Sequence, residues 1–226
     1  PALPFAEAIA VQGDRILGLG TIEDLAQWGD YEVDDQFKDH ILLPGFVEAH
    51  THVMTGGVWE FPYVGFYDRV DPTGRTWSGC RDLSSVVERL QECERDLEDP
   101  QQPLIAWGLD PIFLQGERLV AKHLDQVSEK RPIFVYHASG HLATINSEMM
   151  RRSDIDRHTP TPGVARDTDG EPNGELQEPA AMFLAQGGFA ALGAAIMSPN
   201  AKWNYAREAR NCGVTTVTDL GTTRLA

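Results

Sequence analysis

The sequence predicts an α/β protein in which a parallel sheet follows a small β module. Three observations support this prediction. Apolar, strand-like runs alternate with helical patterns from Gly45 onward; Pro44-Gly45 interrupts the chain directly before the first run; and that run leads into His50-Thr51-His52. We therefore expect a domain boundary between residues 1–44 and 45–226.

The first domain begins with the pattern of a β-hairpin. Two apolar runs, 8–11 and 16–19, flank Gln12-Gly13-Asp14, a turn whose residues tolerate unusual backbone angles. Residues 21–24 then have the spacing of a helix-start box, in which a hydroxyl and an acidic side chain satisfy backbone N–H groups reciprocally.

The second domain contains three runs that we interpret as core strands of a barrel, at residues 46–49, 133–136 and 214–218. The clearest helix begins near Ser85, with Glu88 three residues later as its capping partner. Its apolar residues fall on one face, and Asp99-Pro100 ends it.

Composition narrows the functional classes. The formal charge of −15 argues against nucleic acid, because phosphate binding depends on clustered Lys and Arg. The three cysteines are widely spaced and odd in number, which favours a reducing compartment and hence the cytoplasm. A length of 226 residues allows a sizeable core but is short for a complete (β/α)8 barrel of about 250 residues.

An uncharged run at residues 179–197 raises the question of a membrane span. It is rich in Ala and Gly and is interrupted by Gln186-Gly187-Gly188, which is unlike an apolar spanning helix. We expect a buried or lid-forming pair of helices there, and no membrane partner.

His50 and His52 follow the first apolar strand of the second domain. Strand side chains alternate between faces, so both imidazoles project to one side and Thr51 to the other. Two nitrogen donors then converge on one point, as a metal site requires. A surface or structural histidine pair is the alternative interpretation.

The residues around this pair, Leu43-Pro44-Gly45-Phe46-Val47-Glu48-Ala49-His50-Thr51-His52, resemble the first-strand signature of the amidohydrolase superfamily. Similarity to its amidohydrolase 3 family continues through four later segments. They resemble a Gly/Trp/Asp segment, the second-strand block, a loop before a helix and the third strand, at residues 107–110, 131–141, 166–178 and 213–219.

The resemblance implies a (β/α)8 TIM-type barrel, represented by its first strands and a long insertion after strand one, with residues 1–44 as part of a small β-sandwich domain. It also implies a metal-dependent amidohydrolase that cleaves an amide, formamide or cyclic amide C–N bond of a small molecule with a metal-activated water. His50 and His52 are the implied ligands of one or two divalent ions, with zinc the expected metal.

Two further residues are candidates for catalysis. His141 lies just beyond the expected second strand, where a barrel carries its active-site loops, and could bind substrate or polarise a carbonyl; capping of the next helix is the alternative. Through the family likeness, Glu178 could bind metal or orient substrate. The alternative is an acidic residue in the first turn of a helix, which the helix dipole stabilises.

Three residues are candidates for substrate binding. Trp107 and Asp110 could line a pocket, although an aromatic residue near a strand end is often part of the core. Asp219, at the end of the expected third strand, could support a metal-binding imidazole or cap the next helix.

The chain also departs from the family pattern. Many relatives have His where Thr218 stands, and the expected fourth-strand Lys, two later His and final Asp have no counterpart. We therefore expect this sequence to be the N-terminal portion of a longer enzyme. A heterocycle deaminase and a non-catalytic binding relative are the alternative functions, and a homo-oligomer is compatible with the sequence.

Overall fold

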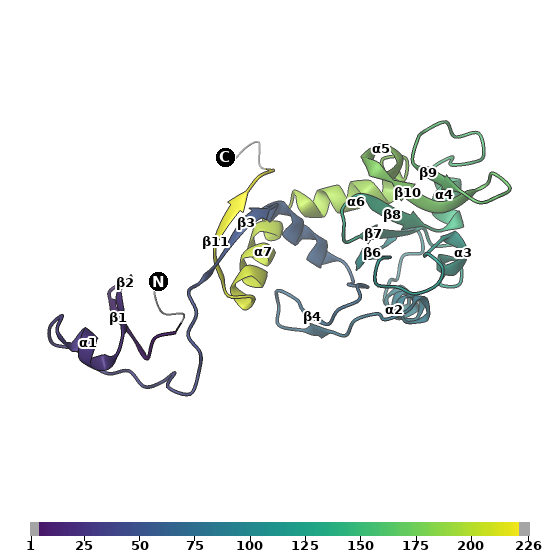
Figure 1. Ribbon diagram of the computed structural model, residues 1–226. Coiled ribbons are helices and arrows are strands. Elements are labelled where there is room, and N and C mark those ends of the chain that lie inside the picture. The colour runs from purple at the N-terminus through teal and green to yellow at the C-terminus, as the bar shows by residue number, and fades with distance from the viewer. Residues whose placement is uncertain (1–4, 222–226) are drawn as a thin grey trace. The chain divides into compact units, whose positions relative to one another are not determined.

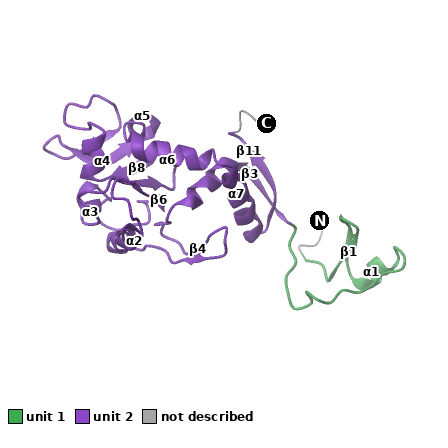
Figure 2. Cartoon of the chain, turned by 180° about the vertical axis from the view of Figure 1, so that it is seen from behind, with its two compact units in different colours: residues 1–44 green, residues 45–226 purple. Residues whose placement is uncertain are grey.

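The computed structural model describes residues 5–221 of the 226-residue chain. The chain divides into two compact units, Pro1–Pro44 and Gly45–Ala226 (Figure 2). The division coincides with the Pro44-Gly45 interruption that precedes the strand bearing the two histidines.

The first unit contains a hairpin and one short helix. Strands β1 (Ala8–Gln12) and β2 (Arg15–Gly20) pair antiparallel, and Gly13 takes a φ of +61° in the turn between them. Helix α1 (Ile22–Ala26) begins with the expected box, because Thr21 and Asp24 each accept the other's backbone N–H. These local predictions are confirmed; membership of a β-sandwich stays a prediction.

The second unit begins with β3 (Phe46–Thr51), which pairs in parallel with β11 (Val214–Asp219), far along the chain (Figure 1). The register sets Val214 beside Phe46 and Asp219 beside Thr51. Two helices adjoin these strands: the 3₁₀ helix η1 (Val53–Glu60) follows β3, and α7 (Pro199–Asn211) precedes β11.

A five-stranded mixed sheet lies between β3 and β11 in sequence. Its order is β6-β7-β8-β10-β9, with β6 and β7 parallel and the other neighbours antiparallel. The bounds are β6 (Leu104–Leu109), β7 (Ile133–His137), β8 (Leu142–Ile145), β9 (Val164–Arg166) and β10 (Pro172–Gln177).

This sheet corrects the expected barrel. The strand predicted at residues 133–136 exists as β7, but β6 and β8 occupy both of its edges, so it cannot pair with β3 or β11. Residues 166–178, expected as a loop, contain β10. Within residues 5–221 the fold is therefore mixed α/β with small open sheets, and no barrel is closed.

Both faces of the five-stranded sheet are buried. Alternate residues of β7 separate into two apolar clusters. Ile133 and Val135 pack with Leu90 of α2 (Leu83–Arg95), whereas Phe134 packs with Leu192 of α6 (Gln186–Ile196). The sheet therefore has its own hydrophobic core, with helices on either face.

The remaining elements complete the second unit. They are β4 (Arg69–Val70), β5 (Thr76–Trp77), α2 (Leu83–Arg95), α3 (Ala121–Leu124), α4 (Ser147–Arg152), α5 (Glu178–Met182) and α6 (Gln186–Ile196).

Two sequence expectations about helices can now be judged. Helix α2 begins two residues before the predicted Ser85, because Asp82 is its cap and Ser85 returns the capping bond. The uncharged run forms α5 and α6, the expected helix pair. No helix in residues 5–221 is long and apolar enough to cross a membrane.

Candidate metal and active site

His50 and His52 lie together at the carboxyl end of β3. Their ring centroids are 5.6 Å apart, and the ring planes are nearly perpendicular. Both residues are exposed, and His52 is the residue from which η1 begins. The alternation expected from the strand therefore leaves two imidazoles next to each other at one strand end.

Asp219 reaches this place from the neighbouring strand. Its Oδ2 accepts the backbone N–H of Val53 at 3.4 Å, and its Oδ1 accepts that of Gly221 at 2.9 Å. Gly221 lies so close to His52 that a Cβ there would overlap the Nδ1 atom. Asp219 thus accepts the backbone N–H of the first residue of η1. The alternative, a cap for a later helix, falls beyond residues 5–221, so both roles of Asp219 stay predictions.

The histidine pair fits part of a metal-binding set. Imidazole nitrogens are common zinc ligands, but zinc sites in proteins use at least three protein ligands. Among residues 5–221, no three His, Cys, Asp or Glu side chains converge as a metal site would need. The two imidazoles match the chemistry of such a site and supply two of its positions.

His141 and Glu178 form a second polar pair, on the five-stranded sheet. His141 Nδ1 lies 2.9 Å from Glu178 Oε2, and the Glu178 N–H donates to the His141 carbonyl at 2.7 Å. Pairing of β8 with β10 brings together these residues, 37 positions apart. The following element at His141 is β8, so the helix-capping alternative is wrong.

Glu178 also has an unusual backbone. Its φ of +66° lies in the left-handed region, which residues other than glycine rarely adopt. Glu178 opens α5, so the alternative of an acidic residue in a first helical turn holds structurally. That alternative does not account for the backbone conformation, and such conformations cluster at functional sites.

Trp107 is a core residue of β6. It is 8% exposed and packs against Tyr63 and Trp59, with ring centroids 5.1 and 4.7 Å away. Its indole Nε1 is buried and has no hydrogen-bond partner. Asp110, just beyond β6, accepts the N–H of Ile112 in a tight turn. Direct substrate contact by Trp107 and Asp110 stays a prediction.

Sequence analysis passed over a buried polar cluster near the ends of β7 and β10. His137 is 2% exposed and bonds Thr144 Oγ1 through Nε2 at 2.9 Å. Burial lowers the pKa of His137 to about 4, against the opposing effect of Glu175. Glu175 is itself buried and pairs with Arg118 at 2.6 Å. The sequence around Glu175, Asn173-Gly174-Glu175-Leu176-Gln177, carries no pattern that predicts its burial.

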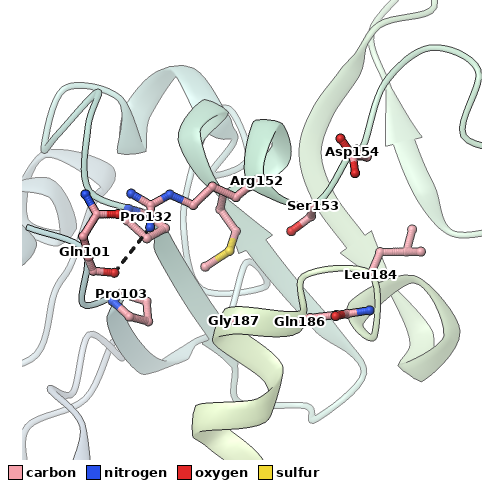
Figure 3. A pocket seen from close by; sticks show the side chains of 10 residues that line it. Gln101, Pro103, Pro132, Arg152, Ser153, Asp154, Leu184, Gln186 and Gly187 are labelled. Atoms are coloured by element: carbon pink, nitrogen blue, oxygen red, sulfur yellow. Dashed lines mark hydrogen bonds between the residues drawn. The ribbon is translucent and has the colours of Figure 1, made fainter.

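One cavity of about 400 Å³ opens between α4, the start of α6 and the residues before β6 (Figure 3). Met149 and Arg152 belong to its lining, and Arg152 contacts the Gln101 carbonyl at 3.4 Å. None of the residues predicted for the site lines this cavity. The cavity and the histidine pair are therefore separate features.

The amidohydrolase family model matches residues 38–223. The chain belongs to the amidohydrolase family. The matched segment includes both histidines, the five-stranded sheet and β11, and therefore covers the described residues 45–221 of the second unit.

Two curated relatives are much longer than this chain. Protein LONG AFTER FAR-RED 3 of Arabidopsis thaliana is 26% identical over 224 residues, covering 97% of this chain and 36% of that protein. Exoenzymes regulatory protein AepA of Pectobacterium carotovorum subsp. carotovorum is 33% identical over 147 residues, covering 62% and 29%. The chain thus spans about a third of the length of these two relatives.

Two solved structures are also similar, both described as uncharacterized metal-dependent hydrolases. The proteins come from Pyrococcus furiosus and Pyrococcus horikoshii OT3 and are each 17% identical to this chain. Their TM-scores are 0.41 and 0.43, and each comparison covers 92% of this chain and 39% or 38% of the other.

Proposed function

We propose that this chain carries the first metal ligands of a hydrolase that cleaves an amide, formamide or cyclic amide C–N bond of a small molecule. The observation that carries the proposal is the His50–His52 pair. Two exposed imidazoles are neighbours at the carboxyl end of a parallel strand, inside a segment that matches the amidohydrolase family.

The proposal assigns β3 and β11 to adjacent positions in a (β/α)8 barrel. They are parallel, and α7 directly precedes β11, as a helix precedes each strand in a β/α repeat. The five-stranded sheet is then an insertion between two barrel strands. Residues 1–44 would contribute to a small β-sandwich domain.

In this assignment His50 and His52 hold a divalent ion, with zinc proposed because imidazole is one of its usual ligands. Such an ion polarises a substrate carbonyl and makes water more acidic. The two imidazoles determine where the ion lies. Asp219 supports them by fixing the backbone at Val53, one residue beyond His52. The site requires further ligands besides this pair, and one or two ions are compatible with it.

His141 and Glu178 are the proposed catalytic residues of this chain, His141 by binding substrate or polarising its carbonyl and Glu178 by binding metal or orienting substrate. Nδ1 of His141 lies 2.9 Å from Oε2 of Glu178, so the carboxylate can orient the imidazole and share a proton with it. The left-handed backbone at Glu178 supports a functional role. Asp110 and Asp219 are proposed to contact substrate, and buried Trp107 to support the surrounding wall.

We also propose that the protein resides in a reducing compartment, and hence in the cytoplasm. Cys80, Cys93 and Cys212 are free, and Cys80 is buried. Burial raises the pKa of the Cys80 and Cys93 thiols, which keeps them protonated and unreactive at neutral pH.

A non-catalytic regulatory role is the second candidate, because one relative is named an exoenzymes regulatory protein. Purified protein loaded with Zn²⁺ and offered amides, formamides, cyclic amides and amino-heterocycles separates the candidates. Hydrolysis of an amide-type bond that a chelator abolishes and Zn²⁺ restores would support the proposal. Ammonia from heterocycles alone would assign a deaminase, and stoichiometric metal without turnover would assign a binding relative.

A further inference from the structure

The helix that follows His52 has an unusual form. Residues Val53–Glu60 make an eight-residue 3₁₀ helix, although such helices seldom exceed three or four residues because their hydrogen bonds are poorly aligned. Local preference therefore does not explain η1. Its conformation must depend on the elements packed against it.

Two glycines allow that packing. A Cβ at Gly56 would overlap the carbonyl oxygen of Ala201 in α7, and one at Gly57 would overlap that of Ala195 in α6. Gly56 and Gly57 are both buried. The backbone of η1 thus lies directly against two helices, and α7 runs into β11, the partner of β3.

A charged network holds the far end of η1. Glu208 of α7 accepts the indole N–H of Trp59 at 2.8 Å and forms an ion pair with Arg69. The Arg69 guanidinium lies over the Trp59 ring, 5.5 Å from its centroid, and 5.8 Å from that of Trp107. The Glu208 side chain is only 20% exposed, which strengthens both interactions relative to surface pairs.

We propose that Glu208, acting through Trp59 and Arg69, is a positioning residue for the metal-binding pair His50 and His52. The proposal rests on the metal-binding function proposed above. His52 directly precedes η1, and Trp59 lies in the last turn of this helix. Contacts at these two ends therefore fix the orientation of η1. Asp219 holds the near end through Val53, and Glu208 holds the far end.

Loss of the far anchor frees η1 to leave its 3₁₀ form, and the His52 side chain then samples more orientations. Metal affinity falls because the two imidazoles no longer converge before the ion binds. Groups that hold metal ligands in place change affinity by about 10–100-fold when they are removed.

Three variants of the purified protein test this, with Co²⁺ as the probe. Glu208→Gln keeps an acceptor for Trp59 but removes the charge facing Arg69, and Trp59→Phe keeps the ring but removes the donor. Glu94→Gln is the matched control, because Glu94 of α2 pairs with Arg131, just before β7, at 3.1 Å. The readouts are the Co²⁺ dissociation constant, the visible Co²⁺ absorption spectrum and urea unfolding without metal.

We expect Glu208→Gln and Trp59→Phe each to weaken Co²⁺ binding about tenfold and to alter its spectrum, with Glu94→Gln unchanged. Unchanged affinity and spectrum in both test variants would overturn the positioning role, as would an equal loss in the control. Wild-type protein that binds no Co²⁺ would instead overturn the proposed function, and the positioning role with it.

Discussion

The two parallel strand pairs of the second unit are alike in sequence and different in burial. In β6 and β7 nearly every residue is buried, and Phe134 is fully inaccessible. In β3 and β11 apolar residues face solvent: Val47 is 65% exposed and Val217 41%. All four strands consist largely of apolar or β-branched residues.

The difference teaches that an apolar run specifies a strand but not what covers it. The β6–β7 pair is flanked on both faces by helices, whereas much of β3 and β11 is exposed although α7 contacts β11. The stable core and the candidate metal ligands therefore lie in different regions. Stability and metal binding should respond to different substitutions.

The largest expected effect on stability comes from the five-stranded sheet. Phe134→Ala should lower the free energy of unfolding by about 3–5 kcal/mol, because it removes a fully buried ring. Val47→Ala, on β3, should change it by less than about 0.5 kcal/mol. Urea denaturation of residues 1–226 measures both. Equal losses would show that another surface covers β3 in solution.

Acid should destabilise the second unit through the buried His137. Its folded pKa of about 4 lies below its ordinary 6.5, so below pH 6.5 the unfolded chain takes up a proton that the folded chain does not. The contribution of His137 to stability should fall by about 1.4 kcal/mol per pH unit between these values, and that contribution should level off below pH 4.

His137→Gln should remove that part of the pH dependence, and His158→Gln, at an exposed position, should retain it. Unfolding by urea at several pH values between 7 and 4 makes the comparison. An unchanged slope in His137→Gln would refute the assignment.

Two adjacent glycines of α6, Gly187 and Gly188, allow a comparison of a buried and an open position within one helix. A Cβ at Gly188 would lie 2.5 Å from the Phe134 ring, whereas nothing lies within 4 Å of one at Gly187. Gly188→Ala should therefore cost about 1–3 kcal/mol through overpacking. Gly187→Ala should be neutral or stabilising by up to about 1 kcal/mol. Thermal unfolding of the two variants side by side gives the answer, and a reversed order would contradict the packing.

Local features were predictable from the sequence because they depend on neighbouring residues. The turn at Gly13, the capping box at Thr21 and the left-handed end of α7 at Gly213 all follow from backbone chemistry within a few positions. The closeness of His50 and His52 follows from the two-residue period of a strand, which needs no tertiary information.

Pairing between distant segments was not predictable. A short apolar run such as residues 133–136 is equally compatible with a barrel strand and with a strand of a separate sheet, and only its neighbours β6 and β8 decide between them. The contact of His141 with Glu178 likewise depends on the register of β8 against β10. The roles of Trp59 and Glu208 require the packing of η1 on α7, which leaves no periodic signal.

The most direct test of the central claim is metal content after dialysis, measured by elemental analysis on wild type and three histidine variants. We predict that His50→Ala and His52→Ala each lose the divalent ion, with affinity more than about tenfold lower, while His158→Ala keeps it. Far-UV circular dichroism should be unchanged in all three, because these side chains are exposed. Metal retained at the wild-type level in both His50→Ala and His52→Ala would contradict the account.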